Sequence, residues 1–139
     1  MAARVCRTDA DLDLARWRLQ ARQIDVSIAD LKVDHAVVTI DDESGVFWAR
    51  LDDNPADGSP CWWVLWHFEQ QWGPLVVAAC EEAVRLGLGD IPARWIVPAG
   101  NPIEDWYKGT LKARVSTTAE KQHKYEITPA KVIAALKVA

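Results

Sequence analysis

Several features that would assign a class at once are scarce or missing in this sequence. Its 139 residues include only three cysteines, Cys6, Cys61 and Cys80, and their number and spacing fit neither a disulfide framework nor a metal site. We therefore expect buried free thiols and a reducing compartment. No apolar run reaches the roughly 18 residues of a membrane span, and the N-terminus lacks the apolar core of a signal peptide. These absences predict a cytoplasmic protein with no membrane anchor.

Basic charge is also in short supply. The formal net charge is −4 and the isoelectric point is about 5.3, which argues against a broad nucleic-acid surface. Acidic residues are densest at Asp9–Asp13 and Asp41–Asp57, whereas the C-terminal third is locally basic. Its cations are Lys108, Lys112, Arg114, Lys121, Lys124 and Lys131. Solvated faces are the ordinary explanation of such asymmetry. A nucleic-acid-modifying role through the basic third is a weaker hypothesis.

The common catalytic signatures are absent. The sequence contains no GxSxG, HExxH, GxxxxGK[ST] or GxGxxG motif. The three histidines, His35, His67 and His123, are scattered and lack the spacing of metal ligands. Asp41-Asp42-Glu43 is typical of a hairpin turn rather than a cation site. We therefore expect no metal cofactor.

Tryptophan, in contrast, is abundant. The chain has eight Trp but only two Phe and two Tyr. Most of the Trp residues fall in strand-like runs, so we expect them to supply bulk to the core. The cluster Trp62–Trp63–Trp66 is expected in the core rather than in a cleft. A ligand cleft or a partner surface is the alternative interpretation.

Hydrophobic periodicity predicts one mixed α/β domain over residues 1–139, with a sheet covered by helices. Asp52–Pro60 is the clearest loop, and Glu81, Glu82 and Arg85 are expected on the outer face of their helix. Strands are expected at Ala3–Thr8, His35–Asp41, Val46–Leu51, Cys61–Glu69, Arg94–Val97, Arg114–Thr118 and Lys124–Ile127. Helices are expected at Asp9–Ile24, Ile28–Val33, Leu75–Leu86, Pro102–Lys108 and Thr128–Leu136.

The segment after residue 60 carries the most chemical information. Cys61–Glu69 is apolar on both alternating faces, which predicts a central strand buried on both sides. A turn with Gly73 and Pro74 leads straight into a helix. The free N–H groups and dipole of such a helix attract phosphate, and a glycine lets a ligand approach closely. Pro74 removes one donor from this set.

These elements resemble the GNAT superfamily of N-acyltransferases, which have a mixed, mostly antiparallel central sheet flanked by helices. The family's pyrophosphate loop, Gln/Arg-x-x-Gly-x-Gly/Ala, is similar to Gln70-Gln71-Trp72-Gly73-Pro74-Leu75, although Leu75 replaces a small residue. The family's later Asn and aromatic-Tyr pair is similar to Asn101 followed by Trp106-Tyr107. Thr8 is the expected N-cap of the helix that begins at Asp9, and Thr8–Leu12 also resembles the family's opening helix. The resemblance in element order spans most of the chain.

The resemblance implies an acetyl-CoA-dependent transfer to a small-molecule or protein amine. Backbone N–H groups of Gln71–Leu75 would hold the pyrophosphate, and the main chain at Leu65–His67 would pair with the pantetheine arm. Asn101 would contact that arm, and Tyr107 would protonate the leaving thiolate. Glu69 and His67 are the candidate bases, acting directly or through water.

Each of these residues also has a simpler structural interpretation. Tyr107 would pack a short helix on the sheet, Asn101 would cap that helix, and His67 would be a core histidine. The altered phosphate loop and the excess of Trp favour a second hypothesis. On this hypothesis the chain is a non-catalytic GNAT-like binding or structural subunit of a larger assembly, for example a phage particle, or a homo-oligomer.

Overall fold

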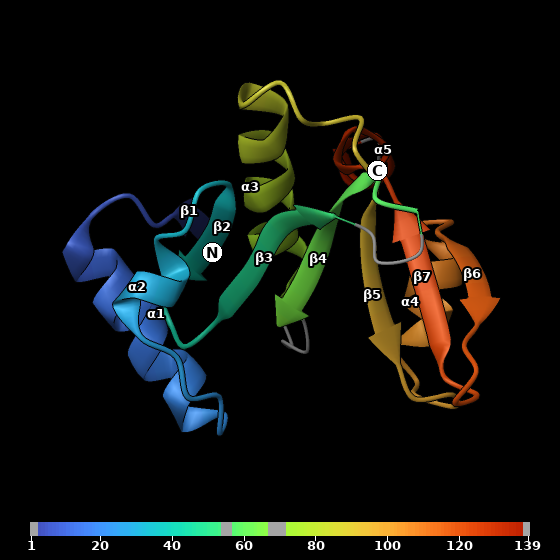
Figure 1. Ribbon diagram of the computed structural model, residues 1–139, viewed down its shortest axis with the longest axis horizontal. Coiled ribbons are helices and arrows are strands. Elements are labelled where there is room, and N and C mark those ends of the chain that lie inside the picture. The colour runs from blue at the N-terminus through green and yellow to red at the C-terminus, as the bar shows by residue number, and fades with distance from the viewer. Residues whose placement is uncertain (1–2, 54–56, 67–71, 138–139) are drawn as a thin grey trace.

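The computed structural model describes residues 3–53, 57–66 and 72–137, which form a mixed α/β fold (Figure 1). The described residues contain a seven-stranded sheet in the order β1-β2-β3-β4-β5-β7-β6. The strands are β1 Ala3–Val5, β2 Ala36–Asp41, β3 Val46–Asp53, β4 Pro60–Trp66, β5 Ala93–Val97, β6 Arg114–Thr117 and β7 His123–Ile127. The helices are α1 Asp9–Ala21, α2 Ile28–Leu31, α3 Trp72–Arg85, α4 Glu104–Gly109 and α5 Pro129–Lys137. The predicted fold class, a mostly antiparallel sheet flanked by helices, is confirmed.

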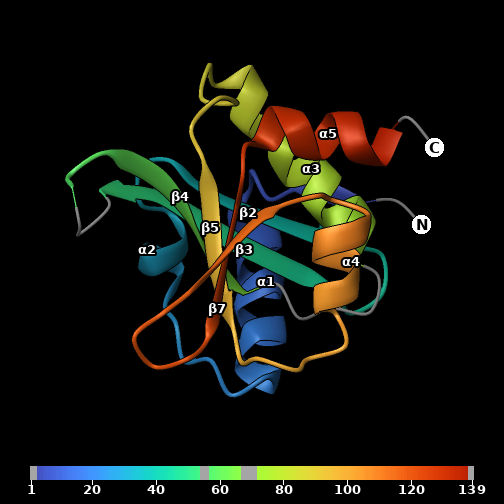
Figure 2. The same ribbon diagram turned by 90° about the vertical axis from the view of Figure 1, so that its right-hand side faces the viewer.

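Helices cover the two faces of the sheet unequally. Every neighbouring pair of strands is antiparallel except β4 and β5, which are parallel. Helices α3, α4 and α5 gather on one face (Figure 2). On the other face, α1 and α2 pack only against β2 and β3, so no described helix covers that side of β4, β5 and β7 (Figure 1).

The larger core lies between the sheet and α3, α4 and α5. Leu75 and Val76 of α3, Tyr107 of α4 and Val132 of α5 point into it, and each is at most 5% exposed. They meet buried side chains of the central strands, including Trp95. This core holds the central and C-terminal elements together through non-directional apolar burial.

A second, smaller core lies under α1. Leu12, Ala15 and Leu19 recur at helical spacing and pack against the opposite face of β2 and β3, near Ile40 and Trp48. As expected, Thr8 caps the helix, because its side chain accepts the N–H of Asp11 at 3.1 Å.

Helix ends differ from the predicted boundaries for local reasons. Helix α1 ends at Ala21 rather than Ile24, because Gln23 adopts a left-handed conformation (φ 66°). The N–H of Ile24 then bonds back to the carbonyl of Leu19, which closes the helix. Helix α3 begins at Trp72, three residues before the predicted start, and ends as expected before Gly87 (φ 76°).

The prediction of a strand buried on both faces is correct only in part. Strand β4 is central, and Cys61 and Trp62 are buried, but Leu65 is 37% exposed because no described helix covers its face. The connection between β3 and β4 is shorter than the predicted loop Asp52–Pro60, since Asp52 belongs to β3 and Pro60 to β4.

Two side chains lie where the pattern did not place them. Glu82, expected on the outer face of α3, is 8% exposed, because Arg7 and Arg85 each form two hydrogen bonds with its carboxylate. Trp17 on α1 is 60% exposed, whereas Trp48, Trp62 and Trp95 are buried as expected. Among the described residues, no helix combines the length and apolar character needed to cross a membrane.

Candidate functional site

The most distinctive feature of the sheet is a gap in its middle. Strands β4 and β5 pair only at Trp62↔Ala93 and Trp63↔Arg94, although β4 runs on to Trp66 and β5 to Val97. Beyond these pairs the two strands diverge (Figure 1). We call this gap the splay. Beyond the two pairs, the backbone groups of β4 and β5 do not have each other as sheet partners, and they face the splay.

A β-bulge in β4 accompanies the splay. Ala49 of β3 faces Val64, but the neighbouring Trp48 faces Trp66, so Leu65 is an extra residue on β4. Such a bulge bends its strand and increases the local twist, which directs the end of β4 away from β5.

One side of the splay lies on the face without a helix. Trp63 and Leu65 of β4 and Ile96 of β5 are partly exposed there, with Leu65 at 37% and Ile96 at 40%. Beside them Arg94 bonds to Glu126 through Nε at 2.6 Å. This hydrogen bond raises the pKa of Arg94, so the cation is fixed beside the splay.

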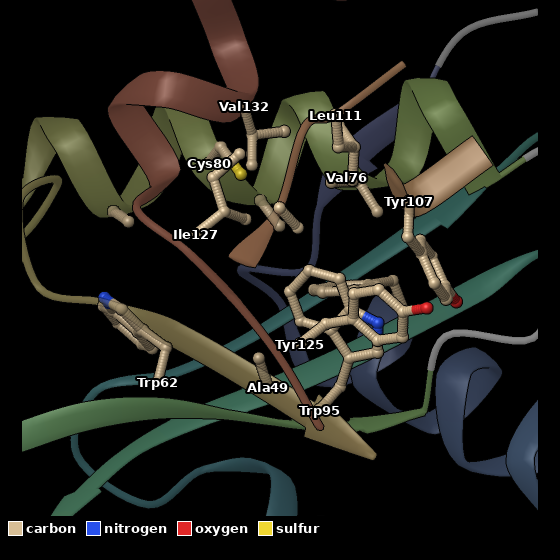
Figure 3. Close-up of a cluster of buried hydrophobic side chains, with 14 of the residues drawn as sticks. Ala49, Trp62, Val76, Cys80, Trp95, Tyr107, Leu111, Tyr125, Ile127 and Val132 are labelled. Atoms are coloured by element: carbon tan, nitrogen blue, oxygen red, sulfur yellow. The ribbon is translucent and has the colours of Figure 1, made fainter. Parts of the chain in front are cut away.

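The other side of the splay rests on a cluster of buried rings (Figure 3). Tyr107 is 0% exposed, and its ring centroid lies 5.2 Å from that of Trp95 and 5.0 Å from that of Tyr125. A cavity of about 40 Å³ opens beside these rings, with Val64 and Tyr107 among its wholly apolar or aromatic walls. Burial raises the pKa of Tyr107 well above its ordinary value. Its phenol therefore stays protonated, as a proton donor must, but it lies within the core.

A buried carboxylate joins α4 to β7 at the same end of the sheet. Glu104, 5% exposed, accepts hydrogen bonds from the Tyr125 hydroxyl at 2.6 Å and from the Gly100 N–H at 2.8 Å, and it contacts Nδ1 of His123. Burial would raise the pKa of Glu104, but these three donors outweigh burial and lower it to about 2. Burial and the carboxylate raise the pKa of Tyr125.

The start of α3 supplies the residues that sequence analysis assigned to a phosphate turn. Gly73 and Pro74 line a surface hollow of about 440 Å³ together with side chains of β1 and α5. A Cβ at Gly73 would meet no atom of the described residues within 4 Å. Leu75 is 0% exposed and belongs to the core, and its carbonyl accepts a hydrogen bond from Thr39 at 2.9 Å.

The remaining candidates divide into two groups. Asn101 is half-buried, and its Oδ1 accepts the N–H of Ile103 at 3.1 Å, which shapes the turn before α4. Trp72 is the first residue of α3. The candidate bases and the first half of the turn lie outside the described residues. These are His67, Glu69, Gln70 and Gln71.

The most strongly perturbed carboxylates, Glu104 and Glu82, were not among the site residues predicted from the sequence. Their partners come from distant parts of the chain, and no local pattern pairs Glu104 with His123 or Glu82 with Arg7. One sequence signal pointed to Glu104. It lies three residues after Asn101, close to a turn whose backbone N–H groups need acceptors, and its carboxylate accepts the N–H of Gly100.

Comparison with known proteins adds no assignment. No family model matches the chain, and no curated protein is significantly similar to it in sequence. Within the described part of the chain, no group of three or more His, Cys, Asp or Glu side chains is arranged to hold a metal ion.

Proposed function

We propose that this chain is a GNAT-like protein that binds acetyl-CoA, or a related acyl-CoA, in the splay and transfers the acyl group to an amine. The splay itself carries the proposal: a parallel pair at the centre of an otherwise antiparallel sheet opens just before a helix. The position of the bulge on β4 and of Tyr107 on the following α4 supports it further. The arrangement agrees with the family resemblance found in the sequence.

The splay suits the pantetheine arm because that arm is narrow, extended and carries two amides. The backbone of β4 at Leu65 and beyond would pair with these amides as a neighbouring strand does. The pyrophosphate would then lie near the start of α3, where helix N–H groups and the open backbone at Gly73 favour an anion.

The reaction needs two proton movements besides approximation of the substrates. The amine nitrogen attacks the thioester carbonyl carbon, and its proton passes to His67 or Glu69, directly or through water. The carbon–sulfur bond then breaks, and the thiolate takes a proton from the Tyr107 hydroxyl. Because Tyr107 is 0% exposed, this step requires the ring cluster to open toward the splay when the cofactor enters.

Calorimetric titration with acetyl-CoA tests the binding site. A Gly73→Glu variant places a negative charge where the pyrophosphate would lie, and we expect binding to be lost. Gly73→Ala is the matched control, because its methyl group meets no atom within 4 Å and carries no charge. A glutamate near a helix N-terminus does not destabilise the helix, so loss of binding would not reflect unfolding. Equal binding by both variants would exclude this site, and no binding by the wild type would exclude the function.

The buried position of Tyr107 favours a second candidate function. If the ring cluster stays closed, the chain keeps the scaffold without a proton donor and serves as a binding or structural subunit of a larger assembly. Trp17 and Leu14, which are 60% and 39% exposed on α1, would then be contact residues. Sedimentation analysis separates the two functions, since a strict monomer with tight acetyl-CoA binding contradicts the assembly role.

A further inference from the structure

The basic residues of the C-terminal third are not used by the proposed function, and some of them converge in space. A surface hollow of about 200 Å³ is lined by residues of three separate segments. They are Pro92, Lys112, Arg114, Glu126, Ile127, Thr128 and Lys131. We call this hollow the basic hollow. It lies where β5 begins and β7 runs into α5. This is the end of these strands that lies opposite the mouth of the splay (Figure 1).

Three cations border the basic hollow, and its one carboxylate is already engaged. Glu126 accepts from Arg94 Nε through Oε2 and from Arg114 Nη2 through Oε1, both at 2.6 Å. Lys112 and Lys131 form no ion pair or side-chain hydrogen bond with any residue that the structure describes. The hollow therefore has an excess of positive charge in a chain whose net charge is −4.

The free groups of the hollow are hydrogen-bond donors. Thr128 Oγ1 accepts the N–H of Lys131 at 3.3 Å, which leaves its hydroxyl proton available. Arg114 uses Nη2 for Glu126 and keeps further N–H groups for a ligand. The two ammonium groups add donors without acceptors. These donors favour an anionic ligand whose oxygens accept several hydrogen bonds.

The position of Lys112 depends on a rigid turn rather than on a free loop. Its backbone is left-handed (φ 55°), and its neighbours Leu111 and Ala113 are 3% and 8% exposed in the core. Lys131 is likewise held on the first turn of α5, next to the buried Val132. Both cations thus project from well-anchored backbone, which lowers the entropy cost of binding.

We propose that the basic hollow binds the phosphate group of a small molecule. A phosphate dianion matches the excess of positive charge better than a carboxylate does, and Arg and Lys donate strong charge-assisted hydrogen bonds to phosphate oxygens. The site is separate from the proposed acyl-transfer site, since it lies at the opposite end of the strands from the start of α3 and the mouth of the splay.

Titration of the full chain with inorganic phosphate and with glycerol 3-phosphate tests this proposal, at constant ionic strength and with amide chemical shifts as the readout. We expect saturable binding in the millimolar range, with the largest shifts near Thr128 and Lys131. Lys112→Gln and Lys131→Gln should each weaken binding about tenfold, the effect of one charge-assisted hydrogen bond. Lys108→Gln removes the same charge from an exposed position outside the hollow and should change the affinity less than about twofold.

Four results would overturn the proposal. Absence of saturable binding would exclude the site. If the largest amide chemical shifts occurred at the start of α3, the phosphate would bind there and not in the basic hollow. An equal effect of Lys108→Gln would mean that only the general field of the basic third attracts the anion. The last test uses an eight-nucleotide oligothymidylate. If it binds more tightly than glycerol 3-phosphate, and if this binding depends steeply on salt, the basic hollow is part of a nucleic-acid surface instead.

Discussion

The hydroxyl of Tyr125 donates a 2.6 Å hydrogen bond to Oε1 of Glu104, a carboxylate that is only 5% exposed. A buried charge is tolerated only where donors replace its lost hydration, so this bond stabilises the contact between β7 and α4. The relationship connects the closing hairpin of the sheet to the helix that carries Tyr107. The stability of this end of the protein therefore depends on polar contacts as well as on the apolar core.

Replacing Tyr125 with Phe should destabilise the protein by about 1.5–3 kcal/mol, because a hydrogen bond to a charged group is lost while the ring is kept. Tyr107→Phe is the matched control, since Tyr107 is also 0% exposed and packs in the same ring cluster. Its hydroxyl interacts with the neutral side chain of Trp95, so its loss should cost about 0.5–1.5 kcal/mol. Urea unfolding of both variants measures the difference. Equal losses would mean that Glu104 contributes nothing beyond a neutral partner.

The lowered pKa of Glu104 makes stability depend on pH in the acid range. Its pKa is about 2 in the folded protein, against an ordinary value of 4.5. The folded state therefore binds the proton less tightly than the unfolded state, and this stabilisation is fully present above about pH 4.5. It should decrease as the pH falls from 4.5 toward 2. The stabilisation by Glu82 should decrease over the same pH range, because hydrogen bonds from Arg85 and Arg7 also lower its pKa to about 2.

Unfolding free energies at pH 5 and pH 3 check this prediction. The wild type should lose stability between the two pH values, and Glu104→Gln should lose less, because its amide does not titrate. Glu82→Gln should remove a separate share of the loss, since the two carboxylates lie in different hydrogen-bonded groups. Unchanged acid sensitivity in both variants would show that neither carboxylate carries the effect.

Local sequence signals predicted the elements of this fold well. Thr8 as a helix cap, Gly87 after α3 and the hairpin of β2 and β3 all depend on neighbours within a few residues. Helix α1 ends before the predicted residue because Gln23 adopts a left-handed conformation. Glycine is the usual sequence signal for this conformation, and position 23 is not a glycine. The exposure of Leu65 escaped prediction for a different reason, since it depends on which face of the sheet the helices cover.

The polar contacts of the site were predicted less well from the sequence than the helices and strands. Glu104 meets Tyr125 and His123, which lie 21 and 19 positions further along the chain. Such contacts follow from the pairing of β5 with β7 and the docking of α4, and no spacing rule predicts them. The basic third was visible as composition, but only the fold brings Lys112, Arg114 and Lys131 around one hollow.

The three cysteines should be inert toward thiol reagents in the native protein. Burial raises the pKa of Cys6 and of Cys80 to about 12, and it also raises the pKa of Cys61. Because the thiolate is the reactive form, labelling with a disulfide reagent at pH 8 should be slow until the chain unfolds. All three thiols should then react in guanidinium chloride, since none forms a disulfide. Rapid labelling of one thiol in buffer would show that its segment opens to solvent.

Tyr107→Phe tests the proposed proton donor, because it removes the phenolic proton and keeps the ring that fills the core. If Tyr107 protonates the leaving thiolate, acyl transfer should slow by about 10²–10⁴ while acetyl-CoA affinity is unchanged. Release of free thiol from acetyl-CoA in the presence of a panel of amines measures the rate. Leu111→Ala is the control, since it opens the cavity beside Tyr107 without touching the hydroxyl chemistry and should lower stability by about 2–5 kcal/mol. A Tyr107→Phe rate equal to that of the wild type would remove Tyr107 from the mechanism and leave it as a core residue. The ring cluster would then be a structural support of the splay, and another group would have to supply the proton.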